Sequence, residues 1–425
     1  PRRHPRQEGP MASIPADRSP ESSLALLRDG YRFIGSRCDR HGGDIFQTRL
    51  LLRPTICLRG RDAATLFYDA DRFERAGAMP MRVQRTLTGR GGVQGLDDAA
   101  HRARKAMLLS LMTPTALRRL GQLFDDEWQA RLPRWAGAGP VVLYPELGRM
   151  LTRAVCAWAG VPLADAQVDR CTTELHAMIE SGASIGPGHW RGLLARRRGE
   201  RWLAGLVDRT RSGALPAPAG SALRVIAEHR DEQGRALPRR IAAVELLNLL
   251  RPTVAVDRFM VFAALALHDH PEWRQRVRDD DAATERFVQE VRRYYPFFPA
   301  AAARVRRSFD WRGYHFPRGR RVLLDLYGTN HHPALWPEPE RFRPERFDGR
   351  PPDPFALIPQ GGGDHATGHR CAGEWLTIEL MKRAVTNLTS RMRYDVPPQD
   401  LAVSLRRMPA LPPSGFVITG VRRTA

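Results

Sequence analysis

Lysine is almost absent from this chain, and several other common sequence signals are missing with it. Of the 67 basic residues, only Lys105 and Lys382 are lysine, so the formal net charge of +21 rests on arginine. This bias runs through the whole chain, and no RNA- or DNA-binding motif accompanies it. We therefore expect a generally basic surface and no nucleic-acid partner.

Cysteine is also scarce, and long apolar runs are missing. The five cysteines are scattered and odd in number, which argues against a disulfide framework and favours a reducing, cytoplasmic compartment. No run approaches the ~20 apolar residues that a membrane helix needs, the longest in the central region being Phe259 to Leu267. The opening PRRHPRQEGP contains no signal-peptide core, and we expect residues 1–20 to be a disordered extension.

The remaining chain, residues 21–425, has the pattern of one mainly α-helical domain with a minor β portion. Segments that could separate domains, such as GALPAPA at 213–219, are short. Helical patterns cover residues 24–31, 63–71, 99–111, 114–134, 145–159, 164–179, 190–212, 220–228, 238–268, 271–278, 281–295 and 374–390, and strand-like patterns cover 44–58, 303–308 and 320–326.

Arg251-Pro252 lies in the middle of the longest predicted helix, within an apolar stretch. At helical spacing Arg251 shares its face with Leu247, Asn248 and Val254, and the nearest acids are six residues away on either side. A buried guanidinium keeps its charge and needs an anionic partner. We therefore expect Arg251 to bind a substrate carboxylate, and we expect Pro252 to kink the helix because it cannot donate to Asn248.

A glycine-rich segment, IPQGGGDHATGHRCAGEW, places Cys371 just before a predicted helix. The helix N-terminus and the neighbouring His369 and Arg370 should favour a thiolate there, which can serve as the proximal ligand of heme iron. Three alternatives remain from the residues alone: an inert thiol, a zinc site, and a phosphate loop. The zinc site lacks paired C-x-x-C spacing, and the phosphate loop lacks the GK[ST] sequence.

Two further motifs make the interpretation specific. The segment QEVRRYYP places Glu290 and Arg293 on one helix face, and PERF ends with Arg346 and Phe347. Together with the cysteine loop, these motifs resemble those of the cytochrome P-450 superfamily over nearly the whole chain from residue 22. The resemblance implies a fold that holds heme b between a long distal helix and a proximal cysteine loop. It also implies that Glu290, Arg293 and Arg346 form a structural ion network that holds this loop.

Two departures from the superfamily pattern indicate a particular branch. Arg251-Pro252 stands where ordinary members carry an acid-alcohol pair, and the cysteine loop GGGDHATGHRCAG is longer than usual. Both departures resemble the fatty-acid peroxygenases, which include α- and β-hydroxylases and decarboxylases. The resemblance implies hydrogen peroxide as co-substrate, a fatty acid as substrate, and no obligatory redox partner. In this hypothesis the bound carboxylate replaces the missing acid-base group.

The same resemblance implies supporting roles for other residues. Gln94 would lie over the heme near the substrate's α and β carbons. His101 and Lys105, which are i, i+4 on one helix face, would hold heme propionates, with Arg75 beside them. Candidate channel-lining residues are Leu87, Phe297 and Phe298.

Several functions remain open at this level. We favour hydroxylation near the carboxyl end, at the α carbon slightly over the β carbon. Decarboxylation to a terminal alkene, a reductase-dependent monooxygenase, and a non-catalytic fatty-acid or heme binder are the alternatives. Chain-length preference and oligomeric state leave no signal in the sequence.

Overall fold

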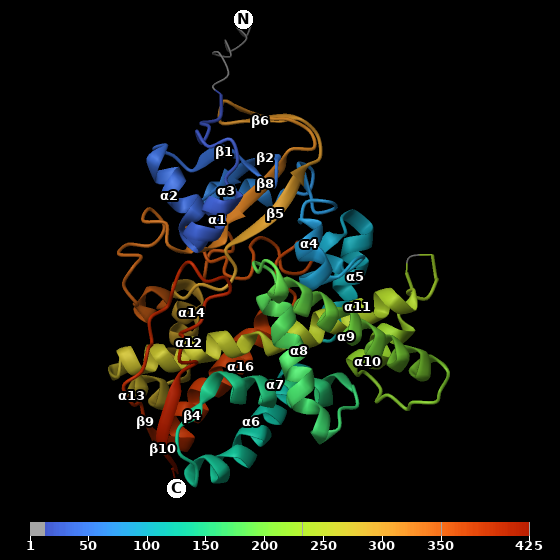
Figure 1. The fold of residues 1–425 in the computed structure, drawn as a ribbon, viewed down its shortest axis with the longest axis vertical. Helices are drawn as coiled ribbons and strands as arrows, with labels where there is room; N and C mark the ends of the chain where they lie inside the picture. Colours follow the sequence, from blue (N-terminus) through green and yellow to red (C-terminus); the bar gives the residue numbers. More distant parts are fainter. Residues whose placement is uncertain (1–12, 232, 350, 425) are drawn as a thin grey trace, which may run out of the picture.

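The structure is a computed structural model that describes residues 13–231, 233–349 and 351–424. Helices make up most of it, as expected, and strands form three small sheets. Figure 1 shows the five-stranded sheet at one end of the molecule, and the three-stranded sheet with the C-terminus at the other end. No helix among the described residues is long and apolar enough to cross a membrane.

The helical body is built on one large apolar core to which most of the helices contribute. The α-helices are α1 (Ser23–Asp29), α2 (Phe33–Arg40), α3 (Arg61–Phe67), α4 (Met81–Val83), α5 (Asp98–Ser110), α6 (Pro114–Ala136), α7 (Leu143–Ala159), α8 (Val168–Glu180), α9 (Pro187–Arg211), α10 (Ala222–Glu228), α11 (Arg239–Val254), α12 (Val256–Asp269), α13 (Glu272–Asp279), α14 (Asp281–Tyr294), α15 (Leu326–Asn330) and α16 (Glu374–Thr386). The short turns are η1 (Gly30–Arg32), η2 (Gln84–Thr88), η3 (Val93–Gly95), η4 (Asp165–Gln167), η5 (Pro344–Phe347) and η6 (Asn387–Arg391). Most predicted helices are present with shifted ends.

The larger sheet has the strand order β1-β2-β8-β5-β3, with β2 and β8 parallel and the other pairs antiparallel. Its strands are β1 (Ile45–Leu50), β2 (Arg53–Leu58), β3 (Phe73–Glu74), β5 (Ala300–Val305) and β8 (Arg321–Asp325). A hairpin joins β6 (Phe309–Trp311) to β7 (Tyr314–Phe316), and β4 (Val141–Val142), β10 (Val417–Arg423) and β9 (Met392–Asp395) form the third sheet. The strands predicted at 303–308 and 320–326 correspond to β5 and β8, and the short hairpin was not predicted.

The expected disorder of the first 20 residues is wrong for residues 13–20, whereas residues 1–12 lie outside the described residues. Ile14 is buried, and Gln47 of β1 exchanges backbone hydrogen bonds with Pro15 and Asp17. The Asp17 carboxylate pairs with the buried Arg37 guanidinium at 2.8 Å. Residues 13–20 are ordered because they pair with a sheet edge and with a buried cation, although their composition alone predicted disorder.

The predicted helix over 238–268 is two helices, α11 and α12, which run in line across the molecule (Figure 1) and meet at Ala255. Pro252 lies in the last turn of α11, where it removes the bond to the carbonyl of Asn248. The break follows three residues later. The expected kink at Pro252 stays a prediction, because α11 continues through Pro252 to Val254 and runs in line with α12, and the prediction of one continuous helix is wrong.

Candidate active site

Arg251 is buried, with 5% of its surface exposed, and it makes no ion pair with any residue that the structure describes. Its Nε atom has no hydrogen-bond partner. Burial, with the nearby charge of Arg196, lowers the pKa of the Arg251 guanidinium from 12.5 to about 9. The side chain is thus a desolvated cation that the described protein leaves uncompensated.

The two nearest acids along the chain are taken by other partners. Glu245 pairs with Arg104 at 2.7 Å, and it accepts the backbone N–H of Val93 at 2.9 Å. Asp257 pairs with His176 at 2.5 Å. Both carboxylates are fully buried. The positive charge of Arg251 therefore remains available to an anion from outside the described chain.

A short segment around η2 and η3 lies against the preceding turn of α11, and we call residues 87–94 the roof segment. Asn248 Nδ2 donates to the carbonyl of Thr88 at 2.8 Å and to Gln94 Oε1 at 3.2 Å. A Cβ atom on Gly92 would lie 2.7 Å from Asn248 Nδ2, so glycine is required for this approach. The structure thus brings Gln94 within one side chain of the helical turn that carries Arg251.

Arg196 of α9 also holds the roof segment in place. Its guanidinium, 1% exposed, donates to the carbonyl of Leu87 at 2.7 Å and to Asn248 Oδ1 at 3.3 Å, and it pairs with Glu200 at 2.7 Å. Sequence reasoning missed both Arg196 and Asn248. Asn248 was noted on the face of Arg251, so its i−3 spacing was a usable signal. Arg196 is one of several arginines in α9, and nothing local distinguishes it.

Cys371 lies directly before α16 in a loop held by several backbone and side-chain contacts. Its N–H donates to the carbonyl of Gln360 at 3.1 Å, and a Cβ atom on Gly373 would lie 3.9 Å from its sulfur. The thiol is free and keeps some accessible surface, and Gln360 Nε2 lies 3.9 Å from its sulfur.

Nearby positive groups favour the thiolate, as expected, but burial has the larger effect in the polypeptide alone. Burial raises the pKa of the Cys371 thiol, outweighing the N–H of Gly373 and the positive charges of Lys105 and Arg292. A coordinated metal ion deprotonates such a thiol by its own charge. The free, partly accessible thiol and the glycine beside it fit an iron-bound heme ligand.

Basic side chains gather next to the cysteine loop. The rings of His101, from α5, and His369 stack at 3.9 Å, and Arg75 lies over the ring of Phe67 at 4.1 Å. Burial lowers the pKa of His101 to about 3 and that of Arg75 to about 10. Carboxylates placed here would relieve this cost, so the cluster fits heme propionates. His369 was not among the residues predicted to hold the cofactor.

Lys105 has a different environment from its neighbour His101. Its ammonium donates to the carbonyls of Gly368 at 2.7 Å and Arg370 at 2.5 Å, and burial lowers its pKa to about 8. Lys105 therefore fastens the cysteine loop to α5.

The predicted ion network is present and completely buried at its centre. Glu290 and Arg293 form two contacts at 2.7 and 2.8 Å, and Arg346 reaches Glu290 at 3.1 Å. Arg293 also donates to the carbonyl of Asn330 at 2.9 Å, and Asn330 Oδ1 accepts the N–H of Ile358 at the start of the cysteine-loop segment. The network is thus connected to the loop through one residue.

A second attachment runs through the residue before Arg293. Arg292 pairs with Glu374 in the first turn of α16, and Glu374 in turn pairs with Arg370 at 2.5 Å. These three side chains hold the start of α16, and with it Cys371, against α14.

The predicted channel residues occupy three different environments. Phe297 stacks on Phe259 of α12 at 4.2 Å, and its carbonyl accepts the hydroxyl of Tyr31 at 2.7 Å. Phe298 is 40% exposed. The side chain of Leu87 is half-buried in the roof segment.

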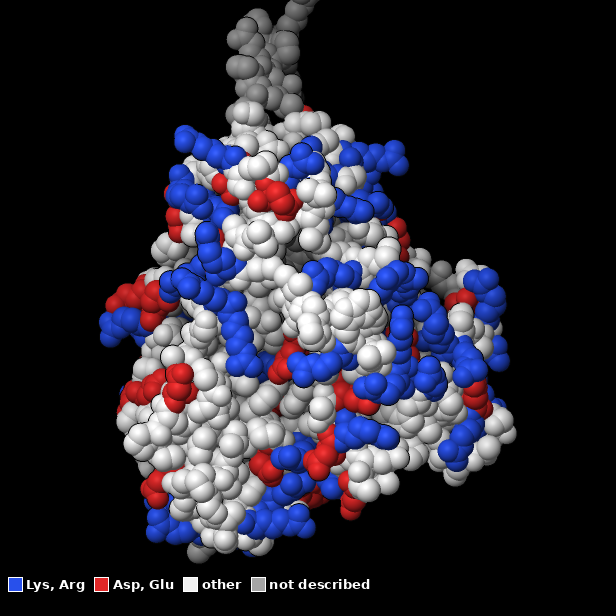
Figure 2. Space-filling model, in the orientation of Figure 1, with Lys and Arg blue, Asp and Glu red and all other residues white. Residues whose placement is uncertain are grey.

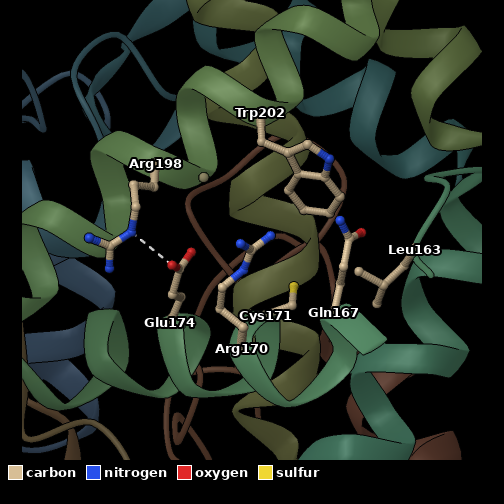
Figure 3. Close-up of a pocket in the computed structure, with 8 residues that line it drawn as sticks. Leu163, Gln167, Arg170, Cys171, Glu174, Arg198 and Trp202 are labelled. Atoms are coloured by element: carbon tan, nitrogen blue, oxygen red, sulfur yellow. Dashed lines mark hydrogen bonds and ion pairs between the residues drawn. The ribbon is translucent and has the colours of Figure 1, made fainter. Parts of the chain in front are cut away.

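A surface pocket of about 510 Å³ between α8 and α9 is separate from all these residues (Figure 3). The figure shows Trp202 over the pocket and an ion pair between Arg198 and Glu174, which are 2.7 Å apart, at one side. Cys171 lines this pocket and is partly accessible, whereas Cys156 is buried. Cys38 is buried in α2.

Comparisons with known proteins agree on one family. The family model for cytochrome P-450 matches residues 266–419. The solved structure of cytochrome P450SP alpha (CYP152B1) in complex with (R)-ibuprophen is 50% identical, covers 95% of this chain and 99% of its own, and superposes with a TM-score of 0.93.

Two more solved structures cover nearly the whole chain. Cytochrome P450EX alpha (CYP152N1) with myristic acid is 44% identical, with coverage of 97% and 100% and a TM-score of 0.95. Cytochrome P450 OleT in complex with arachidonic acid is 36% identical, with coverage of 97% and 99% and the same TM-score. The chain belongs to the cytochrome P-450 family of heme enzymes. Within that family it groups with these CYP152 proteins, as its motifs predicted.

Proposed function

We propose that this protein hydroxylates fatty acids near their carboxyl end with hydrogen peroxide as the oxidant. The observation that carries the proposal is Arg251, a buried cation without an acidic partner in the described chain. Such a cation selects an anionic ligand and positions it by charge-assisted hydrogen bonds. The ligands in the three solved complexes, (R)-ibuprophen, myristic acid and arachidonic acid, all carry a carboxyl group, which supports the proposal.

In this proposal the substrate enters with its carboxylate directed at Arg251. The planar guanidinium can hold both carboxylate oxygens, which fixes the orientation of the first few carbons of the chain. The roof segment covers this end of the fatty acid, with Gln94 held by Asn248 beside the α and β carbons. Leu87, Phe297 and Phe298 are proposed to contact the rest of the alkyl chain.

A heme bound through Cys371 would supply the oxidising chemistry that cleaves the O–O bond and inserts oxygen into a C–H bond. His101, His369 and Arg75 would hold its propionates, and Lys105 would keep the cysteine loop in position. The Glu290, Arg293 and Arg346 network would keep the loop rigid during turnover.

The acid-base step falls to the substrate itself. A carboxylate held by Arg251 can accept a proton from one oxygen of hydrogen peroxide and return it to the other, which then leaves as water. Pro252 adds no donor, because it has no N–H. This arrangement explains why no protein carboxylate is needed beside Arg251, and it predicts that substrates without a carboxyl group react poorly.

The position of oxidation follows from which carbon the Arg251 contact places nearest the oxidant. We propose the α carbon before the β carbon, because the roof segment closes tightly around Gly92 and keeps the carboxyl end of the chain deep in the site. Decarboxylation would require only a small displacement of the same chain.

The test is turnover by the purified holoprotein supplied with hydrogen peroxide and a fatty acid, with no reductase and no NAD(P)H. Hydroxylated products, identified by mass spectrometry, are the expected result. Turnover that depends on NAD(P)H and a reductase would instead assign a conventional monooxygenase. A terminal alkene as the main product would assign a decarboxylase. A spectral response to fatty acid without any product would leave only a binder.

A further inference from the structure

Four large apolar side chains are exposed to solvent in one region, and we call them the apolar cap. They are Met81, Ile185, Trp190 and Leu194, and their exposed fractions are 57%, 62%, 62% and 48%. Met81 begins α4, Ile185 lies in the connection between α8 and α9, and the other two belong to the first turns of α9. Contiguous exposed apolar side chains on a folded protein indicate an interaction surface.

Contacts between these segments make the cap continuous. Arg82 of α4 donates to the carbonyl of Ser184 at 2.6 Å, which brings Met81 next to Ile185. Leu194 follows Trp190 by one helical turn, so the two share a face of α9. Arg90 reaches the sulfur of Met81 at 3.5 Å, which places a guanidinium at the edge of the cap.

The two chain segments that carry the cap are basic. Residues 75–96 and 181–199 contain no Asp or Glu, whereas each segment contains four arginines. Of these, Arg85, Arg90, Arg191 and Arg197 are exposed. Glu180 and Glu200, which bound the second segment, are already paired with Arg258 and Arg196. Figure 2 shows a white bulge in this region of the surface, with blue above and to its right and both blue and red below it.

We propose that the apolar cap docks the protein on an anionic lipid surface. Tryptophan and aliphatic side chains enter the boundary between headgroups and acyl chains, and arginines around them bind the headgroup phosphates. This contact would give the protein access to its substrate, since long-chain fatty acids partition into lipid rather than water. This part of the inference rests on the proposed function. A substrate collected at the surface then needs no path through solvent.

The position of the cap relative to Arg251 supports this arrangement. Met81 and Arg82 lead directly into η2, and the same short segment continues as the roof segment held by Asn248. One stretch of about fifteen residues therefore connects Met81 of the apolar cap to the roof segment, which Asn248 of α11 contacts. A fatty acid that enters beside α4 meets the roof segment first.

The chain offers a matched control surface. Leu51 and Leu52 are also exposed, by 46% and 71%, at the turn between β1 and β2. The carboxylate of Glu21 lies among them, 2.8 Å from the N–H of Leu52. Glu21 offsets part of the charge of the exposed Arg49 and Arg53 at this turn, and the patch has no tryptophan, so we expect the Leu52 surface to contribute little to binding of the same vesicles.

The experiment is co-sedimentation of the full-length holoprotein with vesicles of phosphatidylcholine mixed with phosphatidylglycerol, and with vesicles of phosphatidylcholine alone. We expect binding to the mixed vesicles that weakens as salt is added. Trp190→Ala and Ile185→Ser should each weaken it about tenfold. Arg191→Gln should weaken it about fivefold. Leu52→Ser should leave it unchanged.

No binding of the wild type to mixed vesicles overturns the proposal, and so does equal weakening by Leu52→Ser and Ile185→Ser. Peroxide-driven turnover of dispersed fatty acid, measured on the same variants, separates this proposal from the proposed function. Turnover without vesicle binding refutes docking alone, whereas vesicle binding without turnover refutes the proposed function and leaves the docking surface in place. The cap variants are expected to keep wild-type turnover of dispersed substrate.

Discussion

Replacing Arg251 with methionine should stabilise the ligand-free protein and abolish fatty-acid binding in the same variant. The pKa of this guanidinium falls from 12.5 to about 9, a difference of about 3.5 units. At ~1.36 kcal/mol per unit, the charged side chain carries a burial cost of order 5 kcal/mol. Because Arg251 is only 5% exposed, solvent screening relieves little of it.

Part of this cost is recovered in Arg251→Met, because methionine fills most of the volume without a charge. We expect a gain of ~1–4 kcal/mol, the range seen when buried ionic groups become apolar, and an increase in the unfolding temperature of a few degrees. The penalised form is the cation, so the cost is constant below pH 9. Stability of the wild type would rise with pH only above that value.

Binding should change in the opposite direction. Removing one partner of a desolvated ion pair costs ~3–5 kcal/mol. The dissociation constant for fatty acid should therefore rise by between about a hundredfold and a few thousandfold. The assays are thermal unfolding by circular dichroism and titration of the heme absorption band with fatty acid. Fatty acid should raise the unfolding temperature of the wild type and leave that of Arg251→Met unchanged.

Arg251→Lys serves as the charge-retaining control. It keeps a cation without the planar fork, so it should bind fatty acid more weakly than the wild type and more tightly than Arg251→Met. A lower unfolding temperature in Arg251→Met combined with undiminished fatty-acid binding would refute the reasoning. That result would mean that the protein neutralises this cation itself.

Three other substitutions test the site and the fold. Glu290→Gln leaves Arg293 buried without its counter-ion, so we expect a loss of ~3–5 kcal/mol in thermal unfolding together with heme loss, and a stable, heme-replete variant would contradict the role of the network. Gly92→Ala forces Asn248 from the roof segment and should weaken fatty-acid binding about tenfold at unchanged heme content; unchanged affinity would show that the roof does not shape the site. Burial raises the pKa of Asp325 from 3.8 to about 7, so the stability that its protonated form contributes is lost as pH rises through that range. Asp325→Asn should therefore stabilise the protein at pH 8 but not at pH 4, as measured by chemical denaturation, and equal effects at both values would exclude this titration.

The motifs were predictable because their chemistry depends on short sequence spacing. Glu290 and Arg293 face the same side of any helix that contains them, and a proline at position 252 must disturb any helix that contains it. The length of the continuous helix was mispredicted, because the apolar pattern of 256–268 continues in phase past the break at Ala255. A hydrophobic pattern indicates which residues are buried and does not indicate a break of a single residue between two helices that run in line.

The partners of the site residues were less predictable. Lys105 fastens the cysteine loop through carbonyls more than 260 residues away, and Arg196 reaches the roof segment across 109 residues. The contact of residues 13–20 with β1 was also unpredictable, because the edge of the sheet that they pair with forms only when the chain folds. Hydrogen bonds to backbone carbonyls leave no trace in residue identity, because every residue offers one.

By itself the sequence determined that a guanidinium at position 251 would lie in an apolar helix without a local counter-ion, and that Cys371 would precede a helix in a glycine-rich loop. Those facts follow from side-chain charge and helical spacing alone. Only the tertiary structure decided that Glu245 and Asp257 turn to Arg104 and His176, so that Arg251 keeps its charge for a ligand. The reason is that a charge is compensated by whichever group packing brings within a few ångströms, irrespective of distance along the chain.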